Sequence, residues 1–112
     1  MSDSIVFAAA GDSFITRRLP SLEDKAFRDI VSLLNKADVR FNNLETTLHN
    51  GDIFAGPFSG GTWASSSPDV LNDIKAYGFN LLNWANNHTL DYSYDGLSST
   101  EKYLDQFGFV HA

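Results

Sequence analysis

Short apolar runs alternate along this chain with longer segments of helical periodicity, and this alternation restricts the fold more than any other feature of the sequence. Three of the runs are "SIVFAAA" (4–10), "VRFNNLE" (39–45) and "FNLLNWA" (79–85), and a fourth, "FVHA", comes last. Runs of this length are typical of strands, and we expect the first to be buried. Strands that alternate with helices favour right-handed crossovers, so the sequence predicts an α/β fold of the order βαβαβαβ with a mainly parallel sheet.

The segments between the runs have helix signals. Helices are predicted over 19–38, 66–79 and 94–108. In the first, Ser21 with Asp24 resembles a capping box, which predicts that the helix begins at Ser21. In the second, Pro68 is typical of a first turn and Gly78 of a helix end.

The residues from Thr46 to Ser66 have no periodicity and contain the turn signals "NGD", "GPF" and "SGG". A loop of this length in a compact domain is more often functional than idle. It carries three aromatic residues, Phe54, Phe58 and Trp63. These rings either form a stacking surface for a polymer or partner, or they pack over the sheet.

The composition excludes several classes of protein. With 112 residues, the chain is one domain or part of one. Fourteen acidic residues oppose eight basic ones, and the basic residues do not cluster beyond Arg17 and Arg18, so no nucleic-acid partner is expected. The absence of cysteine excludes disulfides, thiolate metal sites and cysteine nucleophiles. No apolar run approaches the roughly 18 residues of a membrane span, and no signal peptide is recognised at the N-terminus, which leaves the compartment open.

Polar side chains follow each of the first three runs. They are Asp12 after the first, Asn42, Asn43 and Glu45 at the end of the second, and Asn86, Asn87 and His88 after the third. Because the carboxyl ends of parallel strands lie along one edge of a sheet, we expect these groups to converge on one crevice. For this reason "NHT", a glycosylation sequon at Asn87, is predicted to be unmodified.

Each of these residues also has an ordinary structural role open to it, as a turn residue, a cap or a solvated charge. Asp12 after a glycine is typical of a turn or a helix cap. Asp91 and Asp95 are predicted to cap the third helix. No functional role is expected for His49 or His111. A functional site is favoured only because polar side chains follow all three of the predicted strands.

The mixture of groups indicates what would be bound there. Oxygen donors with an imidazole suit hard or borderline divalent cations such as Mg²⁺, Mn²⁺, Zn²⁺ or Fe²⁺. A cation offsets the repulsion between gathered carboxylates. Two such ions about 3.5–4 Å apart can clamp a phosphoryl group and activate water. His88 would then act as the catalytic residue that donates a proton to the leaving group.

Four stretches of the chain, in order, resemble one known family. "GDSF", "ADVRFNNLETTL", "GFNLLNWANNHTLDYSYDGLSST" and "LDQFGFVHA" are similar to the bacterial capsule synthesis proteins of CapA type, which are linked to poly-gamma-glutamate capsules. The most specific segment is "ANNHTLDY" with the following "GL". The family is similar in fold to the calcineurin-like metallophosphatases. The resemblance therefore implies that the predicted βαβαβαβ unit is a portion of a four-layer αββα sandwich.

The resemblance also implies site residues. Asp12 and Glu45 would match the two acidic metal ligands, with Asn43 beside Glu45. Asn87 would match a metal-binding asparagine and His88 a substrate-contacting histidine. One or two divalent ions (Mn, Zn, Fe or Mg) are implied as cofactors.

This sequence departs from the family pattern in two ways. Ser93 stands where the family usually has glycine, which alters a turn. Family members are also much longer, often associated with the cell envelope, and carry further histidine ligands downstream. Residues 1–112 are therefore predicted to be the N-terminal part of a capsule-synthesis domain and a fragment of a longer protein, with an incomplete metal site. Self-association through exposed sheet edges is expected of a fragment.

Three functions remain open at this stage. The first is a metal-dependent hydrolase-like domain of poly-gamma-glutamate capsule biosynthesis, acting on an anionic polymer or a small phosphoester or peptide. The second is a non-catalytic module that binds a polymer or partner. The third is a metal-independent glycosidase-like pair formed by Asp12 and Glu45. Dinucleotide binding is disfavoured because "AAAGDS" lacks the glycine fingerprint.

Overall fold

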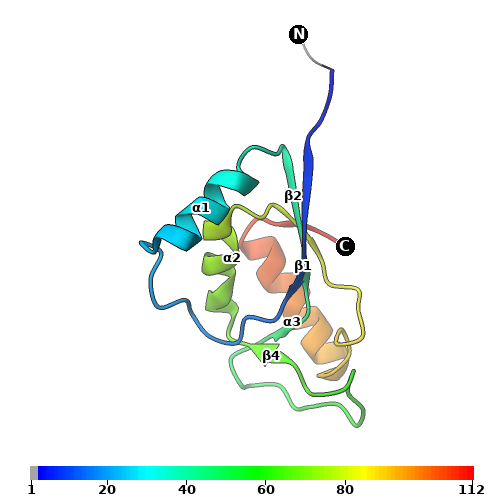
Figure 1. Ribbon diagram of the computed structural model, residues 1–112. Helices are drawn as coiled ribbons and strands as arrows, with labels where there is room; N and C mark the ends of the chain where they lie inside the picture. Colours follow the sequence, from blue (N-terminus) through cyan, green and yellow to red (C-terminus); the bar gives the residue numbers. More distant parts are fainter. Residues whose placement is uncertain (1–2) are drawn as a thin grey trace.

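A computed structural model describes residues 3–112 and has mixed α/β architecture, with three helices beside one main sheet (Figure 1). In chain order the elements are β1 (Phe7–Ser13), α1 (Lys25–Leu34), β2 (Val39–Leu44), β3 (Thr47–Leu48), β4 (Ser65–Ser66), the 3₁₀ turn η1 (Pro68–Val70), α2 (Leu71–Tyr77), β5 (Leu81–Asn83), α3 (Ser93–Gln106) and β6 (Val110–His111). The predicted alternation of strands and helices is confirmed.

The main sheet has the strand order β1-β2-β5-β6, and each neighbouring pair is parallel. Consecutive strands of this sheet are joined by a crossover that contains a helix, as the sequence pattern predicts. The α/β class and the mainly parallel sheet are therefore confirmed. The further layers of an αββα sandwich remain a prediction.

The core lies on one face of the sheet, against α2 and α3. Leu44 and Leu82 point from β2 and β5 into a buried cluster with Leu71 and Ile74 of α2 and Leu104 of α3. Each fully buried leucine contributes roughly 1.5–3 kcal/mol to folding. Figure 1 shows α1 and α2 together on the left of β1 and β2.

The opposite face of the sheet is apolar and open. The register aligns Ala9, Phe41, Leu81 and Val110 in one row across the four strands. Val110 is 68% exposed, and Phe7, which stacks on Phe41, is 57% exposed. Helix packing therefore covers only one side of this sheet.

The first strand corrects two predictions. It runs from Phe7 to Ser13 rather than over 4–10, so Gly11 does not end it and Asp12 lies inside it. It is also largely exposed rather than buried, because β1 is an edge strand and its outer face has no covering layer. A register irregularity between Ala9 and Asp12 brings Asp12 opposite Asn43 of β2.

The start of the first helix is also different from the prediction. The helix begins at Lys25, and Asp24 is its N-cap, with a carboxylate that accepts a hydrogen bond from the amide of Phe27 at 3.1 Å. The hydroxyl of Ser21 accepts instead from Glu23 in the preceding turn. The predicted cap at Ser21 is therefore wrong, because Asp24, expected only as its capping-box partner, is the N-cap.

The other two helices follow their signals closely. Pro68 opens the 3₁₀ turn that leads into α2, and Gly78 ends α2 with a φ of 99°, which favours glycine. The helix α3 matches the predicted segment 94–108 within two residues. The long loop differs more, because its two ends pair as the parallel strands β3 and β4.

The capping result gives a direct test. Replacing Asp24 by Ala should lower the free energy of unfolding by about 1 kcal/mol, because the amide of Phe27 loses its partner. Urea denaturation followed by circular dichroism measures this loss. The matched change Ser21→Ala should cost less than half as much, and a larger effect of Ser21→Ala would contradict the cap assignment.

Candidate functional site

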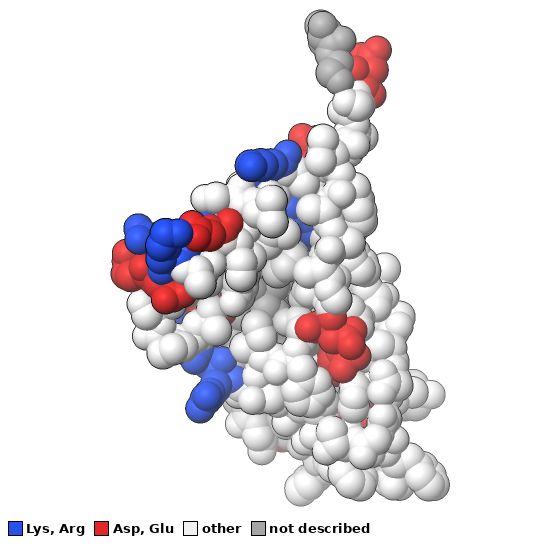
Figure 2. All heavy atoms as spheres, in the orientation of Figure 1, with Lys and Arg blue, Asp and Glu red and all other residues white. Residues whose placement is uncertain are grey.

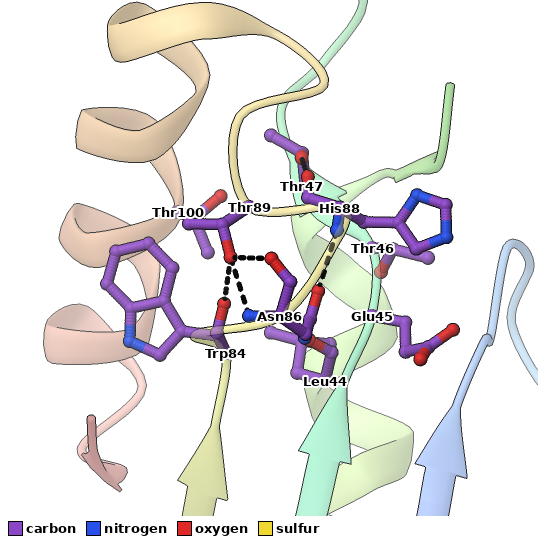
Figure 3. A pocket seen from close by; sticks show the side chains of 9 residues that line it. All are labelled: Leu44, Glu45, Thr46, Thr47, Trp84, Asn86, His88, Thr89 and Thr100. Atoms are coloured by element: carbon purple, nitrogen blue, oxygen red, sulfur yellow. Dashed lines mark hydrogen bonds between the residues drawn. The ribbon is translucent and has the colours of Figure 1, made fainter. Parts of the chain in front are cut away.

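Three strands of the main sheet end at the same edge, and their polar side chains meet there. Figure 3 shows β1, β2 and β5 pointing toward one group of residues, which includes Glu45, Asn86 and His88. The register supports this view, since Asp12 lies opposite Asn43 and Asn43 lies opposite Asn83. Of the predicted group, Asp12, Asn43, Glu45 and Asn86 meet here with the turn that carries His88. Asn42 does not join them, because it lies beside Leu82 on the opposite, core-bearing face of the sheet.

Asn43 holds the two predicted acidic ligands together. Its amide nitrogen donates to Oδ1 of Asp12 at 2.9 Å and lies 3.4 Å from Oε1 of Glu45. Two carboxylates from neighbouring strands thus flank one amide group. A neutral donor between two anions lessens their repulsion and keeps both close to the same point.

The other side of the Asn43 amide is fixed by two more asparagines. Its Oδ1 accepts from Nδ2 of Asn83 at 2.6 Å and from Nδ2 of Asn86 at 3.2 Å. The amide nitrogen of Asn86 also donates to the carbonyl of Leu44, while its Oδ1 accepts from the backbone amide of His88. A continuous chain of hydrogen bonds therefore links both carboxylates to the turn that carries His88.

His88 is oriented by a buried carboxylate. Its Nδ1 lies 2.7 Å from Oδ2 of Asp91, and both side chains are almost completely buried. The backbone carbonyl of His88 accepts from the hydroxyl of Thr47, which fixes the turn on β3. A carboxylate on one ring nitrogen directs the other ring nitrogen outward, the usual arrangement of a histidine that exchanges protons.

Asp91 has a different role from the one expected. It does not cap α3; it accepts hydrogen bonds from the amides of Gly60 and Ala64 as well as bonding His88. The prediction that Asp91 caps the third helix is wrong because its side chain turns inward, to the long loop, where unpaired amide groups need an acceptor. The prediction is wrong for Asp95 as well, since Asp95 lies exposed in the first turn of α3 and the N-cap position is Tyr92, with no capping hydrogen bond from a side chain. The spacing His-x-x-Asp in "HTLD" is the signal that would have identified the His88–Asp91 pair.

The predicted metal ligands are brought together only in part. Asp12 and Glu45 meet at Asn43, but Asn43 presents its nitrogen rather than its oxygen to them. The amide of Asn87 lies outside this group and donates to the carbonyl of Gly60 at 2.7 Å. Among residues 3–112 no group of three or more His, Cys, Asp or Glu is placed to hold a metal ion. Metal coordination by Asn43 and Asn87 and catalysis by His88 remain predictions.

A small cavity lies beside the site. It has a volume of about 10 Å³, room for about one water molecule, and Figure 3 shows the residues that line it, among them Glu45, Asn86 and His88. In this view the imidazole of His88 and the carboxylate of Glu45 point to the same side, away from α3. The imidazole of His88 and the carboxylate of Glu45 therefore face a common region.

The other two histidines lie elsewhere. His111 bonds Asp105 through Nε2 and accepts from the indole of Trp84. His49 is buried, and its ring packs at a tilt against that of Tyr92, with 4.3 Å between the ring centroids. Its Nδ1 accepts a hydrogen bond from the amide of Gly51. Burial lowers the pKa of His49 below its ordinary value, against the attraction of Asp52.

The chain matches a family model along nearly all of its length. The model describes the bacterial capsule synthesis protein PGA_cap and covers residues 6–112. The chain belongs to this family of bacterial capsule synthesis proteins. This confirms the resemblance stated from the sequence, and membership supports a role in capsule biosynthesis.

Two curated proteins are similar to this chain along almost its whole length. The uncharacterized proteins y4sH and y4uA of Sinorhizobium fredii (strain NBRC 101917 / NGR234) are each 38% identical to the chain over 113 residues. The matched region covers 98% of this chain and 24% of either relative. The chain thus spans about a quarter of the length of these curated relatives. No helix within residues 3–112 is long and apolar enough to cross a membrane.

The role of Asp91 can be tested without any substrate. Asp91→Ala should remove the acceptor for Gly60 and Ala64, speed the hydrogen exchange of both amides at least tenfold, and lower the free energy of unfolding by about 3 kcal/mol. Asp95→Ala is the matched control on the same stretch and should cost about 0.5 kcal/mol. Unchanged exchange at Gly60 and Ala64 would contradict the anchoring role.

Stability should depend on pH through His49. Its pKa is lowered in the folded chain from the ordinary value of 6.5, so below that value the unfolded chain binds more protons. The contribution of the uncharged His49 side chain to folding stability is present above pH 6.5 and is lost as the pH falls through the lowered pKa. Urea denaturation at a series of pH values should show a steeper loss on acidification for the native chain than for His49→Gln. Equal slopes for the two proteins would refute this assignment.

Proposed function

We propose that the edge of the sheet carries part of a metal-dependent hydrolase-like site of a capsule biosynthesis protein. The observation that supports this most is the meeting of Asp12 and Glu45, from neighbouring strands, on the amide of Asn43. Gathering two carboxylates at an open strand edge costs free energy, and a divalent cation offsets that cost. The family assignment supports the same reading.

The residues fit a cation in part. Asp12 and Glu45 would supply carboxylate oxygens. Asn43 would add a third oxygen donor only by turning its amide over and giving up the hydrogen bonds from Asn83 and Asn86. Such oxygen-rich donor sets suit Mg²⁺ or Mn²⁺, while Zn²⁺ or Fe²⁺ would need imidazole as well. When bound, the ion would supply an activated water and a Lewis acid. Since this set is incomplete for any of these cations, further ligands would come from substrate, water or other protein groups.

His88 would act as the proton-transfer group. Asp91 bonds Nδ1 of the ring, which fixes the tautomer and leaves Nε2 to donate a proton to a leaving group or to take one from water. The edge of the Phe14 ring lies against the imidazole, with 5.9 Å between centroids. This contact limits rotation of the ring and keeps Nε2 facing the same region as Glu45.

The substrate proposed is an anionic polymer of poly-gamma-glutamate type, or a small phosphoester or gamma-glutamyl peptide. A cation at Asp12 and Glu45 would offset the negative charge of this chain, which is −6 overall, and so allow an anionic substrate to approach. Water activated at such a site would attack either a phosphoester or an amide. Activity should be assayed with a phosphoester and with a gamma-glutamyl peptide, each with and without a chelator. Activity that resists the chelator would favour the metal-independent glycosidase-like pair instead.

Metal binding gives the decisive test of the ligand assignment. Titration calorimetry with Mn²⁺ should show binding to the chain, and Asp12→Asn or Glu45→Gln should each weaken it at least tenfold because one anionic ligand is lost. Asp29→Asn is the matched control, since Asp29 pairs with Lys25 on the exposed side of α1. Unchanged Mn²⁺ affinity in both site variants, with normal circular dichroism, would rule out the proposal.

A second candidate function is non-catalytic binding of a polymer or partner through the long loop. Phe54 is 94% exposed and Phe58 is 84% exposed, so these rings do not pack over the sheet. Trp63 is fixed by a hydrogen bond from its indole to the carbonyl of Gly56. Asp91 fixes the backbone of this loop at Gly60 and Ala64. Binding of polymer that survives loss of metal but not Phe54→Ser with Phe58→Ser would favour this function.

A further inference from the structure

A groove opens on the helix side of the sheet, between β1 and the helices α1 and α2. It has a volume of about 320 Å³, within the range of small-molecule sites. Its walls are mainly apolar and include Ile15, Ile30, Leu34, Ile74, Tyr77 and Phe79. Figure 2 shows that the surface between α1 and β1 is largely uncharged, whereas charged residues gather over the outer side of α1.

The groove exists because α1 stands away from the sheet. No residue of α1 is buried, and the side chain of Ile30 remains 47% exposed. The helix rests on α2, where the ring of Phe27 meets that of Tyr77 at 4.7 Å. The segment before α1 is tied to α2 as well, since Arg18 forms an ion pair with the buried Asp73 at 2.8 Å. The walls are therefore held in place, while the space between α1 and the sheet is left open.

Two buried polar atoms in the wall of this groove lack a protein partner. They are Oγ of Ser13 and Oδ1 of Asn42, and the residues are 6% and 4% exposed. The register places Ser13 beside Leu44 and Asn42 beside Leu82, so both side chains lie on the face of the sheet that carries the core. A buried polar group without a partner costs about 1–3 kcal/mol, which makes two of them in one groove a specific feature.

The chemistry of these atoms defines what would satisfy them. The amide nitrogen of Asn42 already donates to the carbonyl of Gly11, so Oδ1 remains as an acceptor. The hydroxyl of Ser13 rotates about one bond and can either donate or accept. Among the described residues that line the groove there is no Lys or Arg, and Asp12 is the only charged residue. These features disfavour an anion and favour a hydrogen-bond donor, and the mainly apolar walls favour a donor without charge.

We propose that this groove binds a small neutral molecule that has an apolar body and a hydroxyl or amide N–H group. The apolar body lies against Ile30, Ile74 and Tyr77, and the polar group donates to Oδ1 of Asn42 and bonds Oγ of Ser13. The empty groove leaves these two atoms almost without exposed surface, so binding includes a small shift of the side chains that cover them. Because Asp12 lines the same groove, an occupant lies next to the edge of the sheet. This site does not depend on metal binding or on hydrolysis at that edge.

The test compares two probes that differ by one hydroxyl group, benzyl alcohol and toluene. Each is titrated into the ¹⁵N-labelled chain, and the shifts of the backbone amides give the location and the affinity. Both probes should shift amides of the groove, including those of Ser13, Asn42 and Ile74. The ratio of the affinity for benzyl alcohol to that for toluene should fall roughly tenfold in Asn42→Leu, because the acceptor is lost while the apolar walls remain.

Two further variants complete the experiment. Ser13→Ala should lower the same ratio by a smaller factor and covers the case in which Asn42→Leu does not fold. Asn72→Leu makes the same substitution on the exposed side of α2 and should leave the ratio unchanged. The proposal is overturned if neither probe binds saturably, if the shifts lie outside the groove, or if the ratio is the same in the native chain and in every folded groove variant.

Discussion

The side chain of Asn43 is the contact on which the rest of the site depends. It donates toward Asp12 and Glu45 and accepts from Asn83 and Asn86, so one amide joins the ends of three strands. Such a network is stable only when the strands are parallel and in this register, because any slip by one residue would turn Asn43 to the other face. The register of the sheet therefore determines whether the polar groups at its edge can bond to one another.

Asp91 extends this constraint to the long loop. The same carboxylate bonds the imidazole of His88 and two backbone amides of the loop, at Gly60 and Ala64. A segment with almost no regular structure is thereby fixed to the turn that carries the histidine. The exposed rings of Phe54 and Phe58 belong to the same loop, so the surface that could contact a polymer and the group that could transfer a proton are mechanically linked.

The sequence predicted the features that depend on local pattern. The parallel order follows from alternating periodicities, and Gly78 ends its helix as expected. Most of the polar groups at the strand ends meet, but Asn42 and Asn87 do not. The features that were missed depend on neighbours in space. The exposure of β1 follows from its place at the sheet edge, and the burial of Asp91 follows from the path of a loop that has no periodicity. The sequence favoured Ser21 as the cap of the first helix, but Asp24 takes that role, and both residue types are good caps.

Membership of the capsule synthesis family agrees with this arrangement, and the chain spans about a quarter of the length of its curated relatives. The open apolar face of the sheet is consistent with the further layers predicted for an αββα sandwich. Parallel sheets are almost always covered on both faces, so this face is where additional structure would pack. The groove beside α1 lies on the opposite, helix-covered side, which makes its two unpartnered polar atoms independent of that packing.

The most direct measurement of the central claim is a nuclear Overhauser experiment on the side-chain amides of the asparagines. If Asn43 joins the strand ends, the amide protons of Asn83 and Asn86 give cross-peaks to each other, and those of Asn86 also give cross-peaks to the backbone amide of His88. Well-resolved amide signals without any of these cross-peaks would contradict the account, because the strand ends would then not share one polar centre.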